Sequence, residues 1–136
     1  MQEEGIDVNG EAKLFGKLSK KQRDIVSRAE GFLTELKKYK PDEIVEDIDF
    51  LILRAGIIEE ECSDFIRKVE EVRQGETDRT NKMVLVQMVA SVETEKNTVN
   101  ALKESLTALA YAMKQSGKVK DITKLRFFLD ELERCR

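Results

Sequence analysis

The chain has 136 residues, of which 38% are charged and 40% hydrophobic, with one proline and a formal net charge of −3. This length fits one domain with a core that needs no disulfide or metal, and this composition favours long helices. The chain has no histidine, which excludes catalytic systems with a histidine base and zinc sites with histidine ligands. Its two cysteines, Cys62 and Cys135, are too few for a four-thiolate site. We therefore expect no cofactor, no metal and no catalytic residues.

Several absences bear on the compartment. The chain has no secretory signal pattern, no Asn-x-Ser/Thr acceptor and no disulfide framework, which favours a reducing, cytoplasmic location. No uncharged run approaches the length of about 18 residues that a membrane-spanning helix needs.

Basic and acidic residues are segregated along the chain. Residues 11–40 carry nine Lys/Arg against four Asp/Glu, whereas residues 41–76 carry twelve acids against four bases. The favoured interpretation is that basic and acidic helices complement each other within the fold. The alternative is a basic face that meets an acidic protein or lipid headgroups. The overall acidity and the scarcity of aromatic residues argue against a nucleic-acid partner.

The N-terminal part is predicted to be a flexible tail over residues 1–12, followed by a single domain over residues 13–136. The tail has two glycines and no apolar periodicity. The first firm helix is predicted over residues 19–39, because Ser19 and Gln22 form a capping-box pattern ahead of a regular apolar stripe.

The second helix is predicted over residues 41–74, with Pro41 at its first turn. Apolar residues recur at alternating spacings of four and three, as in the heptad seam of a coiled coil. The seam residues are Ile44, Ile48, Leu51, Ala55, Ile58, Cys62, Phe65, Val69 and Val72. Gly56 lies inside this helix, so a kink is expected there if the helix bends.

Two further helices are predicted over residues 78–116 and 121–135. The break before the helix over residues 78–116 contains Gly75, and Thr77, Asp78 and Thr80 are alternative N-caps of that helix. Long helices joined by a short loop form an antiparallel hairpin. We therefore predict an all-α fold, an antiparallel four-helix bundle built on a long helical hairpin.

Two polar features of the seam helices are candidate sites, a run of carboxylates and a single Glu in the apolar stripe. Glu59, Glu60 and Glu61 are consecutive, so they spread around the helix and cannot converge on a metal. Glu95 interrupts the apolar stripe of the third helix. A buried carboxylate needs a partner, and Arg54 is one candidate. The favoured alternative is a polar layer that specifies register, or a seam position near solvent.

The apolar run around residues 50–57 contains more apolar residues than the seam uses. Phe50, Leu53 and Ile57 lie off the seam at spacings of three and four. Either the other helices cover them, which is the favoured interpretation, or they form a patch that binds a partner together with Arg54.

A group of basic residues crowds the start of the first predicted helix, where positive charge opposes the helix dipole. They are Lys17, Lys20, Lys21 and Arg23. Such placement is consistent with contact to something anionic.

The predicted function is a non-catalytic protein–protein interaction module, an adaptor, scaffold or regulatory bundle that presents a helix face or groove to another protein. Self-association as a homodimer is kept open. The alternative is a peripheral membrane-surface module that binds anionic lipid through the basic first helix.

Overall fold

The computed structural model describes residues 2–116 and 122–135, and it places nearly all of them in helices. The elements in chain order are α1 (Gln2–Lys38), α2 (Pro41–Glu46), α3 (Ile48–Gly75), α4 (Arg79–Ser116) and α5 (Ile122–Arg134).

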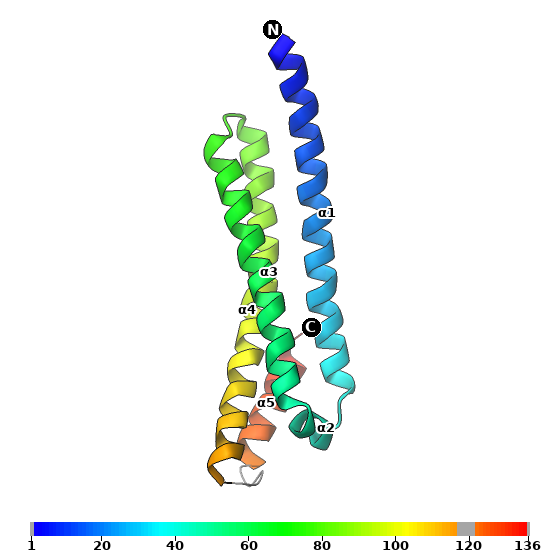
Figure 1. Cartoon of the computed structure of the whole chain (residues 1–136), viewed down its shortest axis with the longest axis vertical. Helices are drawn as coiled ribbons and strands as arrows, with labels where there is room; N and C mark the ends of the chain where they lie inside the picture. The colour runs from blue at the N-terminus through cyan, green and yellow to red at the C-terminus, as the bar shows by residue number, and fades with distance from the viewer. Residues whose placement is uncertain (1, 117–121, 136) are drawn as a thin grey trace.

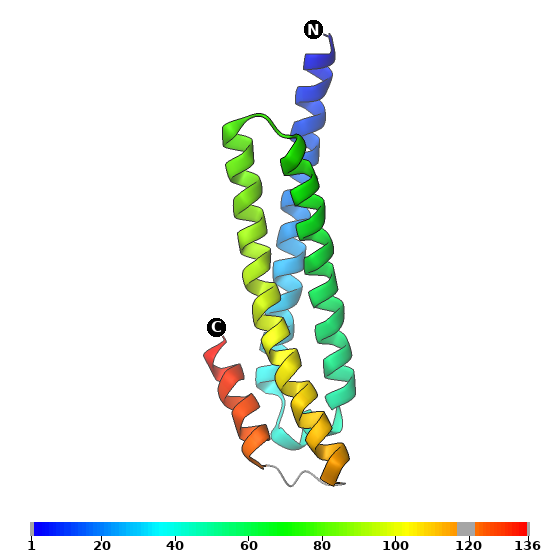
Figure 2. The same ribbon diagram turned by 90° about the vertical axis from the view of Figure 1, so that its left-hand side faces the viewer.

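Successive long helices run in opposite directions (Figure 1). The helices α3 and α4 form a hairpin and share the most extensive contact, and α1 packs against both of them. The shorter α5 packs on α4 and α1, and it covers only the end of the bundle away from the α3–α4 loop (Figures 1 and 2). The predicted all-α antiparallel bundle, built on a long helical hairpin, is confirmed.

The core follows the seam that the sequence predicts. Apolar side chains at heptad spacing remove a continuous stripe of each helix from water. The buried seam residues of α3 are Ile48, Leu51, Ala55, Ile58, Cys62, Phe65 and Val69. They meet α4 residues that are also buried, among them Leu85, Val92, Leu102 and Leu106.

The first helix begins earlier than predicted. The structure places residues 2–12, the predicted tail, in α1, and Ser19 lies inside that helix, so the predicted start at Ser19 is wrong. A start at Ser19 fails because Leu14 and Phe15 pack against the core and Leu18 is buried, so the apolar stripe continues for a further turn upstream of Ser19. The capping-box pattern at Ser19 is therefore not used.

The break in the predicted helix over residues 41–74 is at Asp47, which separates α2 from α3, and not at Gly56. Pro41 starts α2 as predicted, and the Glu43 carboxylate accepts a hydrogen bond from the Lys40 backbone N–H at 2.9 Å. Asp47 has φ −99° and ψ 14°, which turns the chain between the two helices. Ile44 of α2 is nevertheless fully buried, so the short helix closes one end of the core.

The loop between α3 and α4 is fixed by two carboxylates. Glu76 is buried, and its side chain accepts hydrogen bonds from the backbone N–H groups of Thr77 (3.0 Å) and Asp78 (2.9 Å). The Asp78 side chain accepts from the Asn81 backbone N–H at 3.0 Å, which identifies Asp78 as the N-cap among the three predicted alternatives. The loop thus satisfies backbone donors that the helix start leaves free.

Candidate functional site

The outward face of α3 carries three large apolar side chains that the bundle does not cover. The exposed fractions are 56% for Phe50, 60% for Leu53 and 52% for Ile57. The favoured interpretation that other helices bury these residues is therefore wrong. The reason is the position of α5, which packs on α4 and α1 and leaves the outer side of α3 open. We refer to Phe50, Leu53 and Ile57 as the α3 stripe.

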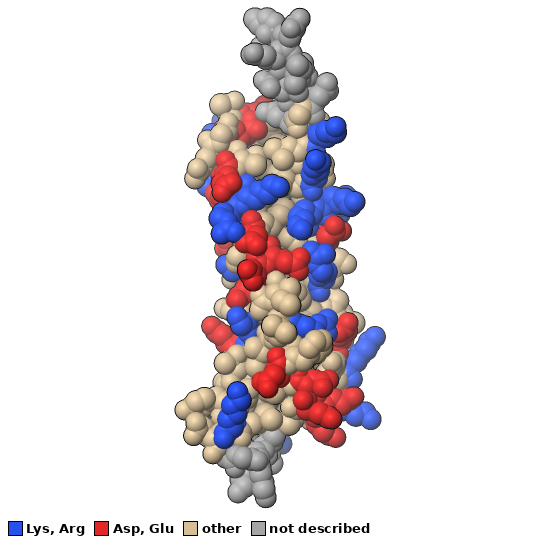
Figure 3. All heavy atoms as spheres, in the orientation of Figure 1, with Lys and Arg blue, Asp and Glu red and all other residues tan. Residues whose placement is uncertain are grey.

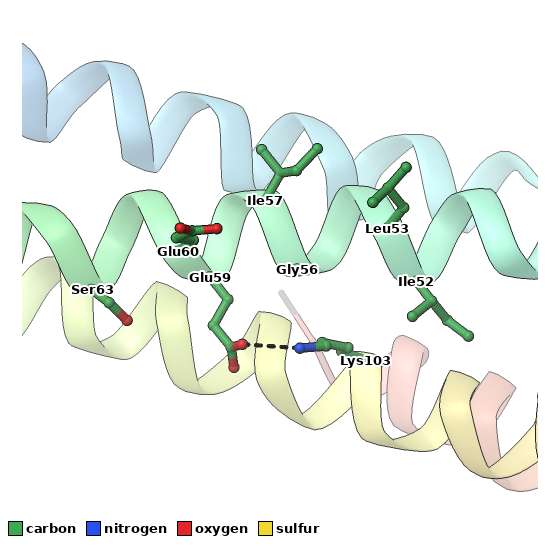
Figure 4. Close-up of a pocket in the computed structure, with 8 residues that line it drawn as sticks. All are labelled: Ile52, Leu53, Gly56, Ile57, Glu59, Glu60, Ser63 and Lys103. Carbon is green, nitrogen blue, oxygen red and sulfur yellow. Dashed lines mark hydrogen bonds and ion pairs between the residues drawn. The ribbon is translucent and has the colours of Figure 1, made fainter.

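A groove of about 600 Å³ runs along α3 beside the α3 stripe. Figure 4 shows Leu53 and Ile57 on one side of α3 and Ile52 on the side toward α4, with Gly56 between them. A Cβ atom added to Gly56 would meet only the Lys103 side chain, at 3.9 Å. The surface is therefore hollow at Gly56, between apolar walls.

The α4 side of the groove is closed by an ion pair. Lys103 Nζ lies 3.1 Å from Glu59 Oε1, and both side chains are about a quarter to a third exposed (Figure 4). The sequence does not predict the ion pair between Lys103 and Glu59. It indicates only that α3 could bend at Gly56. Only the packing of α4 shows that Gly56 forms the floor of a groove.

Arg54 lies beside one member of the α3 stripe, Phe50, and pairs with α1. Its guanidinium donates to Glu35 of α1 at 2.5 Å and lies 5.0 Å from the centre of the buried Phe32 ring. The same group lies 5.9 Å from the Phe50 ring, so Phe50 rests against a charged group that α1 holds in place. The hydrogen bond and charge of Arg54 lower the pKa of the Glu35 carboxyl. Arg54 therefore contacts the stripe at Phe50, and its charge is already paired with Glu35.

Arg54 pairs with Glu35, so the less favoured alternative, in which Arg54 is the partner of Glu95, is wrong. Glu95 instead lies near Cys62. The pKa of the Cys62 thiol is raised to about 11, mainly by burial and also by nearby carboxylates, among them Glu95. Cys62 is about two helical turns from Arg54 along α3. Glu95 is half-buried and has no ion pair or side-chain hydrogen bond with any described residue, as expected for a seam position near solvent.

The carboxyl of Glu95 should make stability depend on pH. Burial, and secondarily the charge of Glu30, raise its pKa in the folded chain. Folding then favours the protonated form, so the contribution of Glu95 becomes less favourable as pH rises from below its unfolded pKa through its folded pKa. We expect Glu95→Gln to raise the melting temperature more at pH 7 than at pH 4, measured by circular dichroism. An equal shift at both pH values would contradict this assignment.

The four basic residues predicted as a patch are all exposed on α1, and they are Lys17, Lys20, Lys21 and Arg23. Figure 3 shows basic side chains gathered over the upper half of α1. Two of the four, Lys17 and Lys21, line a groove of about 370 Å³ between α1 and α3. Glu61 and Asp64 line the same groove, so its charge is mixed, which weakens the case for an anionic surface ligand there.

Comparisons with protein-family models, with curated proteins and with solved structures gave no match. Function is therefore argued from this chain alone.

Three further observations concern metal binding, membrane crossing and the cysteines. In the described part of the chain, no group of three or more Cys, Asp or Glu side chains is arranged to hold a metal ion. No helix among the described residues is both long and apolar enough to cross a bilayer. Both cysteines are free thiols, with Cys62 buried and Cys135 half-buried. Other large apolar side chains, Met83, Val86, Tyr111 and Phe127, are also exposed, but none of them lines the groove beside the α3 stripe.

Proposed function

We propose that the chain is a non-catalytic protein–protein interaction module, a cytoplasmic adaptor or regulatory bundle that binds another protein through the α3 stripe. The observation that carries the proposal is that Phe50, Leu53 and Ile57 are each more than half exposed on consecutive turns of one helix. Single exposed apolar residues are ordinary, whereas adjacent ones beside a groove are typical of binding surfaces.

The stripe lies on a rigid support. The opposite face of α3 is buried along its whole length, from Ile48 to Val69. Arg54, which lies beside Phe50, joins α3 to Glu35 of α1. A partner that docks there would find the apolar side chains already in place, so little conformational entropy is lost on binding. Arrangements of this kind suit helix-in-groove recognition.

Site-specific photo-crosslinking in the protein's own cells tests this function. A photoreactive amino acid at Ile57 is expected to give a discrete adduct of higher mass, and Leu53→Asp in the same chain should abolish it. The control position is Ala101, which is exposed on α4 and away from the groove. An adduct of equal yield from Ala101, or one that survives Leu53→Asp, would contradict the proposal. An adduct of twice the chain's mass would assign the stripe to self-association.

A further inference from the structure

We infer that the partner's binding element is a basic amphipathic helix, which inserts an apolar side chain over Gly56 and sets its Lys or Arg residues against the carboxylates of α2 and α3. This inference rests on the proposed function and specifies the partner of the same surface.

The shape of the surface suits a helix. Residues at i, i+3, i+4 and i+7 outline a diamond on a helix surface, the hole that accepts one side chain of a facing helix. On α3 these positions are Leu53, Gly56, Ile57 and Glu60, and all four line the groove (Figure 4). The hole is open because Gly56 has no side chain and only Lys103 comes within 4 Å of its Cβ position. An apolar side chain entering the hole would contact Leu53 and Ile57.

The charge around the stripe is strongly negative. Between Pro41 and Ile66 the sequence has nine Asp/Glu and one base, Arg54, which pairs with Glu35. Three of the nine acids, Glu59, Glu61 and Asp64, pair with bases elsewhere in the chain, and the other six have no ion pair with a described residue. Figure 3 shows acidic side chains gathered over α2 and along α3.

The carboxylates at each end of the stripe are available to a partner. Asp49 and Glu60 are exposed on the same face as Leu53, at the two ends of the stripe. Neither has an ion pair or a side-chain hydrogen bond within the described part of the chain. Glu59, by contrast, is held by Lys103. A partner helix with Lys or Arg beside its apolar residues would complement both ends.

The same charges oppose pairing of the stripe with a second copy. In a two-fold antiparallel contact that sets Leu53 of each copy over Gly56 of the other, Glu60 of each copy would lie opposite Asp49 of the other, and all four positions are on α3. In a parallel contact each carboxylate would lie opposite the same carboxylate of the other copy. Like charges facing each other across an apolar contact are unfavourable. The occupant is therefore a different, basic chain.

Selection from a displayed library of helical peptides tests the inference. The library is randomised at exposed positions and selected on the full chain alone, and the enriched peptides are then measured on the Leu53→Asp chain. We expect the enriched peptides to carry apolar residues at helical spacing and a net positive charge. Their binding, measured by fluorescence anisotropy, should weaken with added salt.

The two glycines Gly56 and Gly31 provide a matched pair of variants. Gly31 is exposed on α1 with open space around its Cβ position. Gly56→Ala places a methyl group in the hole and is expected to weaken the selected peptides roughly tenfold, whereas Gly31→Ala should leave binding unchanged. Equal binding by the two variants would contradict insertion at Gly56.

The remaining outcomes separate the inference from the proposed function. Enriched peptides that are neutral or acidic, yet sensitive to Leu53→Asp, would overturn the basic partner and leave the binding surface in place. No enrichment, or enrichment that ignores Leu53→Asp, would overturn both. Dimers of the unmodified chain in light scattering, lost on Leu53→Asp, would assign the stripe to a second copy and overturn the inference.

Discussion

Replacing Phe128 by alanine is expected to lower the free energy of unfolding by about 3–5 kcal/mol. Phe128 is fully buried and is the largest buried side chain of α5, the helix that closes one end of the bundle. The neighbouring Phe127 is 55% exposed, so Phe127→Ala should change the free energy of unfolding by less than about 0.5 kcal/mol. Urea denaturation followed by circular dichroism measures both variants.

Comparison of the variants Phe128→Ala and Phe127→Ala tests whether α5 is part of the folded core. Ser105 of α4 donates a hydrogen bond to Glu131 of α5 at 2.8 Å, and the Lys37 ammonium of α1 donates to the Cys135 carbonyl. These contacts act together with Phe128 to hold α5 against two helices. Equally small losses for Phe128→Ala and Phe127→Ala would show that α5 is not packed as described.

Leu51→Ala is expected to lower the free energy of unfolding by about 2–5 kcal/mol, whereas Leu53→Ala should change it by less than about 1 kcal/mol. The two leucines are two positions apart on α3, with exposed fractions of 0% and 60%. The difference follows from which face of α3 each side chain occupies. The difference between the two losses of stability is measured from the urea denaturation midpoints of the two variants at equal protein concentration. Similar losses for both variants would show that something covers the stripe in the free chain.

The helices and the core were predictable because the apolar spacing is regular over many turns. The α3 seam from Ile48 to Val69 is buried as its heptad pattern predicts. The exceptions lie where local signals compete with packing. Ser19 carries a good capping pattern, yet the stripe extends upstream through Leu18, and burial of that stripe outweighs a single cap.

The surface was only partly predictable. The apolar spacing places Phe50, Leu53 and Ile57 off the seam. Whether another helix covers these residues depends on where α5 packs, and the apolar periodicity does not predict the position of α5. The partner of Arg54 is not predictable for a similar reason, because its contact with Glu35 depends on the register of α1 against α3. The groove at Gly56 likewise requires the position of Lys103 on α4.

The most direct test of the central claim, that the outward face of α3 binds a partner while the opposite face holds the bundle, compares the unmodified chain with Leu53→Asp. The quantity measured is the dissociation constant of one library-selected peptide at fixed salt, together with the urea midpoint of each chain. We predict that the peptide binds at least about tenfold more weakly to Leu53→Asp while the midpoint changes little. Equal dissociation constants for the two chains would contradict the claim.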